Sequence, residues 1–130
     1  MAYARQVHGA DVARATGGFA GDVDVLATAE RGVPLAIFTA DCLAITAWDA
    51  EAGALSVAHV GWRGTVKAAQ QAGVTALRSL GAEPARLRVA IAPAIGPCCY
   101  EVDEPVIGEF TRAFGAERLL RWSRPRGPAT

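Results

Sequence analysis

The sequence predicts an α+β fold, a mixed β-sheet domain with flanking helices, and three observations support this prediction. The chain has 130 residues, of which 52% are hydrophobic, and this is enough to bury one core. Short apolar runs suited to strands fill its middle. Apolar residues at helical spacing follow these runs and recur near residues 105–114. We therefore expect one domain over residues 1–130, with a basic, partly frayed tail over residues 115–130.

The first predicted elements are strands. Residues 1–20 show no sustained period and are expected to be irregular, with one short strand. Residues 34–39 are a continuous apolar run that predicts a buried strand. Residues 43–48 and 54–60 flank a turn-rich segment, so they predict two strands joined as a hairpin.

Two helices and one more strand complete the prediction. Past residue 64 the chain runs to Leu80 without proline and places its apolar residues on one face, which predicts one long helix capped by Gly81. Residues 87–92 predict a further strand. Asp103 is then expected to cap a second helix whose first turn carries Pro105.

Charge and cysteine content exclude several classes of protein. The 13 basic and 13 acidic residues balance, so there is no global electrostatic attraction to nucleic acid or to an anionic membrane. Apolar stretches such as residues 34–40 fall far short of the about 20 residues of a spanning helix, and no signal peptide opens the chain. Three cysteines, two of them adjacent, predict reduced thiols. We expect a cytoplasmic protein.

Two histidines and one cysteine lie where a metal site can form. Cys42 follows one predicted strand and His59 closes another, so neighbouring strands would bring them to one point; His8 lies beside a glycine. Three protein ligands with an open fourth position form a catalytic zinc site, in which zinc lowers the pKa of water to about 7. Two other interpretations stay open: histidines satisfied in loops beside a small buried cysteine, or a nucleophilic Cys42 with His59 as its base.

A glycine-rich segment follows His59. The sequence Gly61-Trp62-Arg63-Gly64 lies between a strand and a predicted helix, so free backbone N–H groups and the positive end of the helix dipole would face whatever His59 faces. Arg63 adds a guanidinium group suited to phosphate or carboxylate. The spacing is not that of a P-loop. The alternative is a glycine turn with Trp62 packed in the core.

Residues 93–101 predict an apolar loop that can form a pocket wall, with Tyr100 stacking on a flat ligand. The loop shares a Pro-Cys pair with the zinc nucleobase deaminases. Because their second cysteine spacing and their His-x-Glu half are missing, that family is excluded. Cys98 and Cys99 are then expected to be buried structural cysteines.

Four motifs in this order closely resemble the YfiH family, and the resemblance spans about residues 4–114. The motifs are Gln6-Val7-His8-Gly9, Thr39-Ala40-Asp41-Cys42, His59-Val60-Gly61-Trp62-Arg63-Gly64 and Ile95-Gly96-Pro97-Cys98-Cys99-Tyr100-Glu101-Val102. This family was once labelled multicopper polyphenol oxidase or laccase and later recognised as purine nucleoside phosphorylases that also deaminate adenosine. Its members are normally longer at both ends, and they usually carry alanine where this chain has Val60.

The resemblance implies an α+β zinc enzyme that acts on purine nucleosides. Its zinc ligands would be His8, Cys42 and His59. The implied activity is phosphorolysis of adenosine, inosine or 5′-methylthioadenosine, with adenosine deamination beside it. We interpret Asp41 as a proton carrier for deamination and Arg63 as a phosphate-binding catalytic residue. The substrate-binding residues would be Gly61, Gly64 and Tyr100.

The older oxidase label fails on the number of ligands. A multicopper oxidase needs about ten imidazoles, whereas this chain has two histidines. A blue-copper site is disfavoured because Met1 is the only methionine available as an axial ligand. Two further alternatives remain: a Cys-His hydrolase with Cys42 as nucleophile, and a non-catalytic module that binds zinc or a partner. A symmetric homodimer could replace surface that longer family members possess.

Overall fold

The computed structural model describes residues 1–125 and 127 of the chain. These residues form two compact units, Met1–Ala94 and Ile95–Thr130, and each is described by itself. The first unit contains the β-sheets and all three predicted metal ligands. The single domain over residues 1–130 stays a prediction. Among the described residues, no helix has the length and apolar character required to cross a membrane.

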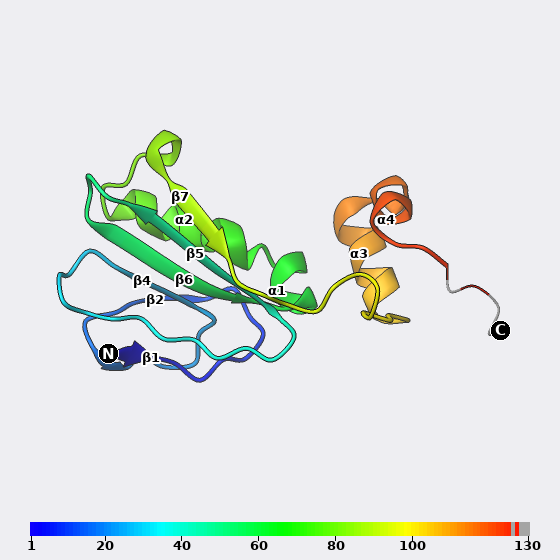
Figure 1. The fold of residues 1–130 in the computed structure, drawn as a ribbon, viewed down its shortest axis with the longest axis horizontal. Coiled ribbons are helices and arrows are strands. Elements are labelled where there is room, and N and C mark those ends of the chain that lie inside the picture. The colour runs from blue at the N-terminus through cyan, green and yellow to red at the C-terminus, as the bar shows by residue number, and fades with distance from the viewer. Residues whose placement is uncertain (126, 128–130) are drawn as a thin grey trace. The chain divides into compact units, whose positions relative to one another are not determined.

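A five-stranded mixed sheet forms the centre of the first unit (Figure 1). Its strands, in spatial order, are β2 (Val12–Arg14), β4 (Val25–Thr28), β6 (Ala54–Val60), β5 (Leu43–Asp49) and β7 (Arg88–Ile91). Strands β2 and β4 are parallel, whereas the other neighbours are antiparallel. A separate parallel pair joins β1 (Ala2–Tyr3) to β3 (Gly18–Phe19). The predicted α+β class with a mixed sheet is therefore confirmed.

The predicted hairpin is also confirmed. Strands β5 and β6 pair along their whole length, with Leu43 opposite Val60 and Ala44 opposite His59. This register places Cys42, the residue before β5, at the same end of the hairpin as His59. Alternating strand geometry and the turn between the two apolar runs were sufficient to predict this pairing.

The prediction of a buried strand at residues 34–39 is wrong. This run makes only an isolated bridge between Leu35 and Ala2, and Phe38 is 70% exposed. The buried strand is β4, whose four residues are all covered. Val25 packs with Ala69 on one face of the sheet, and Leu26 packs with Leu35 and Ile37 on the other. The run at residues 34–39 instead packs Leu35 and Ile37 against the core around Leu26. Apolar content alone does not distinguish a strand from a segment that lies over the core.

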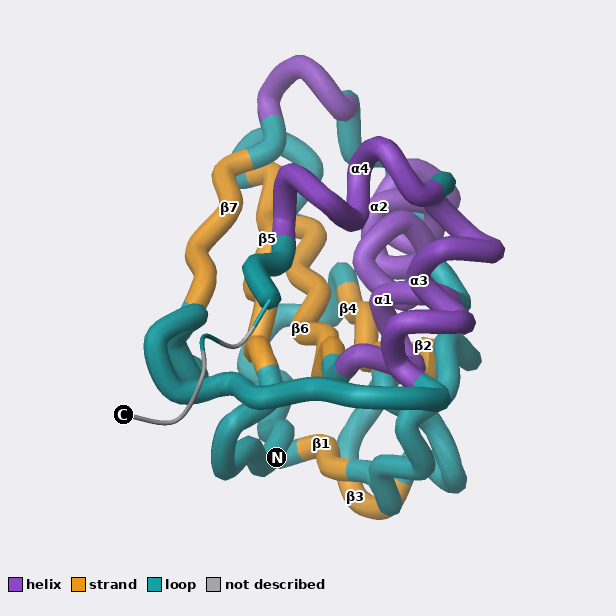
Figure 2. The backbone as a smooth tube through the Cα atoms, turned by 90° about the vertical axis from the view of Figure 1, so that its right-hand side faces the viewer, coloured by secondary structure: helices purple, strands orange, loops and turns teal. Residues whose placement is uncertain are grey.

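The prediction of a single long helix after residue 64 is also wrong. Helix α1 (Trp62–Val66) ends before Ala68, whose φ of 64° lies in the left-handed region, and helix α2 (Ala69–Ser79) begins after it. No glycine or proline lies at this break, and the helical spacing of apolar residues continues across it. The sequence pattern therefore gave no sign of the break. Helix α2 lies against one face of the sheet, as Figures 1 and 2 show, and buries Ala69, Gly73 and Leu77. Gly81, at φ 92°, follows its end as predicted.

The strand predicted at residues 87–92 is confirmed as β7, which follows a short 3₁₀ helix, Pro84–Arg86. The second unit begins with the predicted loop and continues into helices α3 (Val106–Phe114) and α4 (Ala116–Trp122). Phe114 holds these helices together, since its ring centroid lies 5.4 Å from those of both Phe110 and Trp122.

Two details of this unit differ from expectation. Pro105, not Asp103, is the N-cap of α3, and the carboxylate that accepts a backbone N–H, from Gly108 at 3.0 Å, belongs to Glu104. The expected Asp103 cap is therefore wrong, because the helix begins too late for its side chain to reach the first turn. Helix α4 occupies part of the segment expected to fray, and Arg126 of that tail lies outside the described residues.

Candidate metal centre

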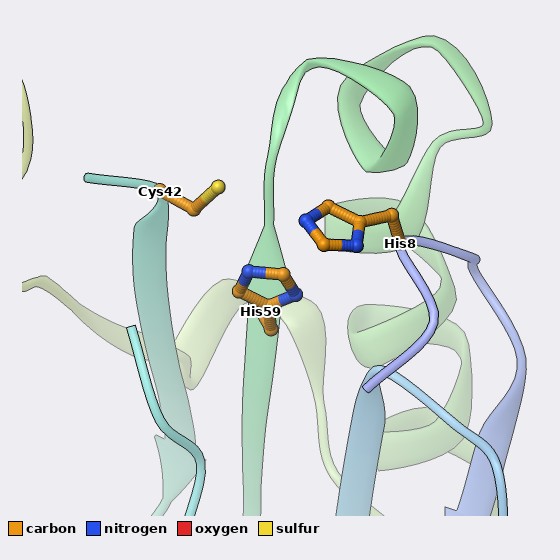
Figure 3. Close-up of side chains that lie close together, drawn as sticks. All are labelled: His8, Cys42 and His59. Carbon is orange, nitrogen blue, oxygen red and sulfur yellow. The ribbon is translucent and has the colours of Figure 1, made fainter. Parts of the chain in front are cut away.

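Three segments distant in sequence bring His8, Cys42 and His59 together. His8 comes from the loop between β1 and β2, Cys42 directly precedes β5, and His59 lies near the end of β6. One ligand atom from each lies within 4.8 Å of the other two, and the side chains point toward one another (Figure 3). The two imidazole centroids are 4.8 Å apart. The structure thus brings together the three residues proposed from sequence.

Asp24 holds the backbone that presents His8. Its Oδ1 accepts the N–H of His8 at 3.0 Å, and its Oδ2 accepts those of Val7 at 3.0 Å and Gly9 at 2.7 Å. His8 has a φ of 58°, a left-handed conformation that costs a non-glycine residue about 1–3 kcal/mol. Charge-assisted hydrogen bonds to three successive amides offset this strain. The loop geometry of His8 therefore depends on Asp24.

The same carboxylate orients His59. Asp24 Oδ1 lies 2.7 Å from His59 Nδ1, and both side chains are buried. Burial alone would raise the pKa of Asp24, but hydrogen bonds from the His59 ring and three backbone amides outweigh it and hold the pKa below its usual range. Asp24 is therefore a carboxylate, and Nδ1–H of His59 donates to it. The other ring nitrogen, Nε2, is left to bind a metal.

Asp24 is the residue of the candidate site that sequence reasoning missed. A weak signal existed, since an acidic residue directly before a fully buried strand needs a strong hydrogen-bonding partner. Its partners at residues 7–9 and 59 are distant in sequence, and no local pattern links them.

Glycine at position 61 leaves space for the side chains of two candidate metal ligands. A Cβ placed there would lie 3.0 Å from the Sγ of Cys42 and 3.2 Å from the Cδ2 of His8. Gly64 is buried, and a Cβ there would lie 3.5 Å from the carbonyl oxygen of Gly9 and 3.6 Å from that of His59. Both glycines thus pack within the protein next to the ligands. Their role in binding substrate stays a prediction.

The Cys42 thiol is half-buried beside negative charge. Burial, followed by the charges of Asp41 and Asp24, raises its pKa. A bound cation would reverse this balance, because a metal deprotonates a coordinating thiol. Two imidazoles and one thiolate suit zinc, whose tetrahedral ligand atoms lie about 3.5 Å apart. Small side-chain movements would close the present cluster to that spacing, so the residues fit the ion.

The predicted catalytic residues Asp41 and Arg63 are both exposed. The Arg63 guanidinium carbon lies 4.2 Å from the Trp62 ring centroid, a cation–π stacking distance. Helix α1 spans only five residues, so the long-helix dipole expected to act with Arg63 on an anion is absent here. Any attraction for phosphate then depends mainly on the Arg63 side chain.

The structure changes the prediction for the cysteine loop. Cys98 and Cys99 are exposed, so the expected buried pair is wrong. The loop carries them on a turn at its surface, where apolar neighbours do not enclose the thiols. Tyr100 belongs to the same second unit, and its stacking on substrate stays a prediction.

Comparison with known protein families identifies the chain's relatives. The model of a family described as multi-copper polyphenol oxidoreductase laccase matches residues 1–128. The chain belongs to this family. The solved structures similar to it include the YfiH protein of Bacillus licheniformis, with a TM-score of 0.80 and 30% identity over 89% of this chain and 48% of that one. YlmD of Geobacillus stearothermophilus has a TM-score of 0.73 and 34% identity, over 95% and 49%.

Relatives of this YfiH/laccase family chain include proteins named as nucleoside enzymes. A purine nucleoside phosphorylase of Deinococcus radiodurans is 43% identical over 115 residues, which are 88% of this chain and 46% of the relative. Adenosine deaminase RL5, from an unknown prokaryotic organism, is 38% identical over 83% of this chain and 40% of its own length. The chain thus spans about half the length, or less, of these relatives.

Proposed function

We propose that this chain carries the zinc centre of a purine nucleoside phosphorylase that also deaminates adenosine. The observation that carries the proposal is the convergence of His8, Cys42 and His59 within 4.8 Å. Relatives named for both activities support it. The substrates would be phosphate with adenosine, inosine or 5′-methylthioadenosine, and the compartment would be the cytoplasm.

Each residue of the centre has a distinct task in this proposal. His8, Cys42 and His59 bind zinc, and Asp24 keeps His59 in the tautomer whose Nε2 is free. When bound, zinc supplies Lewis-acid chemistry, which makes a nucleophile available for deamination at neutral pH. Asp41, exposed and adjacent to Cys42, carries the proton between substrate and solvent.

Phosphorolysis requires a second anchor, for phosphate. Arg63 is an exposed guanidinium that stacks on the Trp62 ring. It lies four residues after His59 and three residues after Val60, where β6 ends. Its planar fork suits phosphate oxygens, and its position would hold the anion while positive charge develops on the ribose. Arg63→Ala should raise the KM for phosphate and leave zinc content unchanged, with Arg78→Ala as the control. An unchanged phosphate dependence would remove Arg63 from the proposal.

A Cys-His hydrolase is the second candidate, and the Asp24–His59 pair favours it. A carboxylate that orients an imidazole near a thiol is the arrangement used by nucleophilic cysteine enzymes. The raised pKa of Cys42 opposes it, because such enzymes need a thiolate without a metal. Activity that survives chelation, with rapid alkylation of Cys42 in the metal-free protein, would favour this candidate.

The deciding experiment combines zinc content with turnover. Elemental analysis of the wild type, Cys42→Ala and Cys99→Ala would be run beside a phosphate-dependent assay on adenosine and inosine. We expect one zinc per chain in the wild type and in Cys99→Ala, loss of zinc in Cys42→Ala, and release of free base only with phosphate. Zinc without turnover would reduce the function to a metal-binding module, and absence of zinc would leave the hydrolase.

A further inference from the structure

The Sγ atoms of Cys98 and Cys99 lie 3.0 Å apart, and both residues are exposed. They belong to the second unit, whereas the three predicted metal ligands belong to the first. The zinc proposal therefore uses neither thiol.

The backbone of the loop positions the pair. The carbonyl oxygen of Gly96 accepts hydrogen bonds from the N–H groups of Cys99 and Tyr100, each at 3.1 Å. Pro97 restricts φ within this turn. Together these features form a tight turn that presents two neighbouring sulfur atoms on one side, so that little reorganisation is needed for both to bind a single atom.

We propose that Cys98 and Cys99 form a chelating dithiol site for a soft, thiophilic metal ion or a trivalent metalloid. A tetrahedral metal with metal–sulfur bonds of about 2.3 Å needs its two sulfurs about 3.7 Å apart. Exposed side chains can widen the present 3.0 Å spacing by a small rotation. Soft acceptors are the class that selects thiolate over oxygen or nitrogen ligands.

Chain geometry favours chelation over a disulfide. Consecutive Cα atoms lie about 3.8 Å apart, below the usual minimum of about 4.4 Å across a disulfide. A bond between Cys98 and Cys99 would therefore be strained and readily reduced. The hydrogen bond with Cys98, and to a smaller extent burial, raises the pKa of the Cys99 thiol. The thiol proton of Cys99 therefore stays in place until a metal or metalloid displaces it. The pair thus persists as a dithiol available to a ligand.

Phenylarsine oxide is the metalloid probe. Two As–S bonds form, the As=O bond and both S–H bonds break, and the oxygen leaves as water with the two thiol protons. Arsenic remains trivalent, so no oxidant or reductant is required. Cadmium(II) is the metal probe, since its binding releases the two thiol protons and is detected by sulfur-to-metal charge-transfer absorption.

The test uses the zinc-loaded wild type and its Cys98→Ser and Cys99→Ser variants, together with Cys42→Ala, which is expected to lack zinc. Intact mass and titration should show one arsenical or cadmium per chain in the wild type. Loss of the second donor should weaken binding at least about 100-fold in either serine variant. Cys42→Ala, which keeps the pair, should bind as tightly as the wild type.

The two probes also distinguish the ligand class. Binding of the arsenical alone would assign the site to trivalent metalloids, and binding of cadmium alone would assign it to metal ions. The proposal is overturned if neither probe binds, if binding survives in a single serine variant, or if it disappears in Cys42→Ala.

Discussion

Asp24 Oδ1 lies 2.7 Å from Nδ1 of His59, although 35 positions separate the two residues in the sequence. Antiparallel pairing of β4 with β6 sets Val25 opposite Ala58. The residue before Val25, Asp24, therefore lies opposite the residue after Ala58, His59. The same carboxylate binds the backbone of His8. One buried acid therefore positions both histidines of the candidate metal centre.

Replacement of Asp24 should weaken the metal centre. Asp24→Asn removes the charge that accepts three backbone amides and the His59 ring. We expect zinc affinity to fall about 10- to 100-fold and stability to fall by about 1–3 kcal/mol. Competition with a chelator of known affinity would measure the first effect, and urea unfolding would measure the second.

The matched control is Asp22→Asn, two residues away. The side chain of Asp22 pairs with Arg5, and both groups are exposed, so the change should cost about 0–1 kcal/mol and leave zinc affinity unaltered. Equal zinc affinity in the Asp24→Asn and Asp22→Asn proteins would contradict the role of Asp24.

A methyl group at position 61 should disturb two ligands at once. In Gly61→Ala, the new Cβ would lie 3.0 Å from Cys42 Sγ and 3.2 Å from His8 Cδ2, so both must move by a few tenths of an ångström. We expect zinc affinity to fall about tenfold, since metal sites tolerate little displacement of their ligands. Gly64→Ala, whose nearest atoms lie at 3.5 Å, should retain zinc. Isothermal titration would compare them, and equal affinities would reject this steric argument.

Acid should remove the stabilisation that Asp49 contributes. Its buried carboxylate accepts the Nη2–H of Arg86 at 2.9 Å and the N–H of Glu83 at 2.9 Å. Arg86, followed by the Glu83 amide, holds the pKa of Asp49 well below its usual range. A lowered folded-state pKa means that this stabilisation is complete above the unfolded-state pKa of about 3.9 and declines as the pH falls further.

The prediction is that Asp49→Asn lowers Tm at pH 7, and that its difference from the wild type shrinks below about pH 4. Glu51→Gln is the control, because Glu51 is 75% exposed and lies 3.3 Å from Arg86, and it should change Tm little. Thermal melts across this pH range would measure both. A Tm difference between Asp49→Asn and the wild type that grows as the pH falls would contradict this prediction.

Ala68 is a site where glycine should stabilise the protein. Its φ of 64° is left-handed, and glycine accepts that conformation without a Cβ clash, so Ala68→Gly should raise stability by about 0.5–1 kcal/mol. Ala72→Gly, inside α2, should instead lower it by about 0.5–1 kcal/mol. Chemical denaturation would reveal the opposite signs, and loss of stability in both proteins would refute the prediction.

Local patterns were sufficient for the hairpin and for the approach of Cys42 to His59, whereas the set of three candidate ligands came from the family resemblance. The apolar runs at residues 43–48 and 54–60 predicted β5 and β6, and the residues at their ends, Cys42 and His59, then had to meet. Residue chemistry limited the candidates further, because a chain with only two histidines offers few imidazole ligands. These conclusions hold because strand pairing across a short turn is determined by adjacent sequence.

Only the tertiary structure decided which strand is central, where the predicted long helix breaks and which acid supports the candidate metal ligands. The sequence of residues 34–39 resembles a strand more than that of β4 does, yet segments packed on both faces of the sheet bury β4. Ala68 favours helix locally but ends α1. Asp24 acts through partners 15 to 35 positions away. Propensity and periodicity describe a residue's own segment, whereas burial and buried hydrogen bonds depend on which distant segments pack against it.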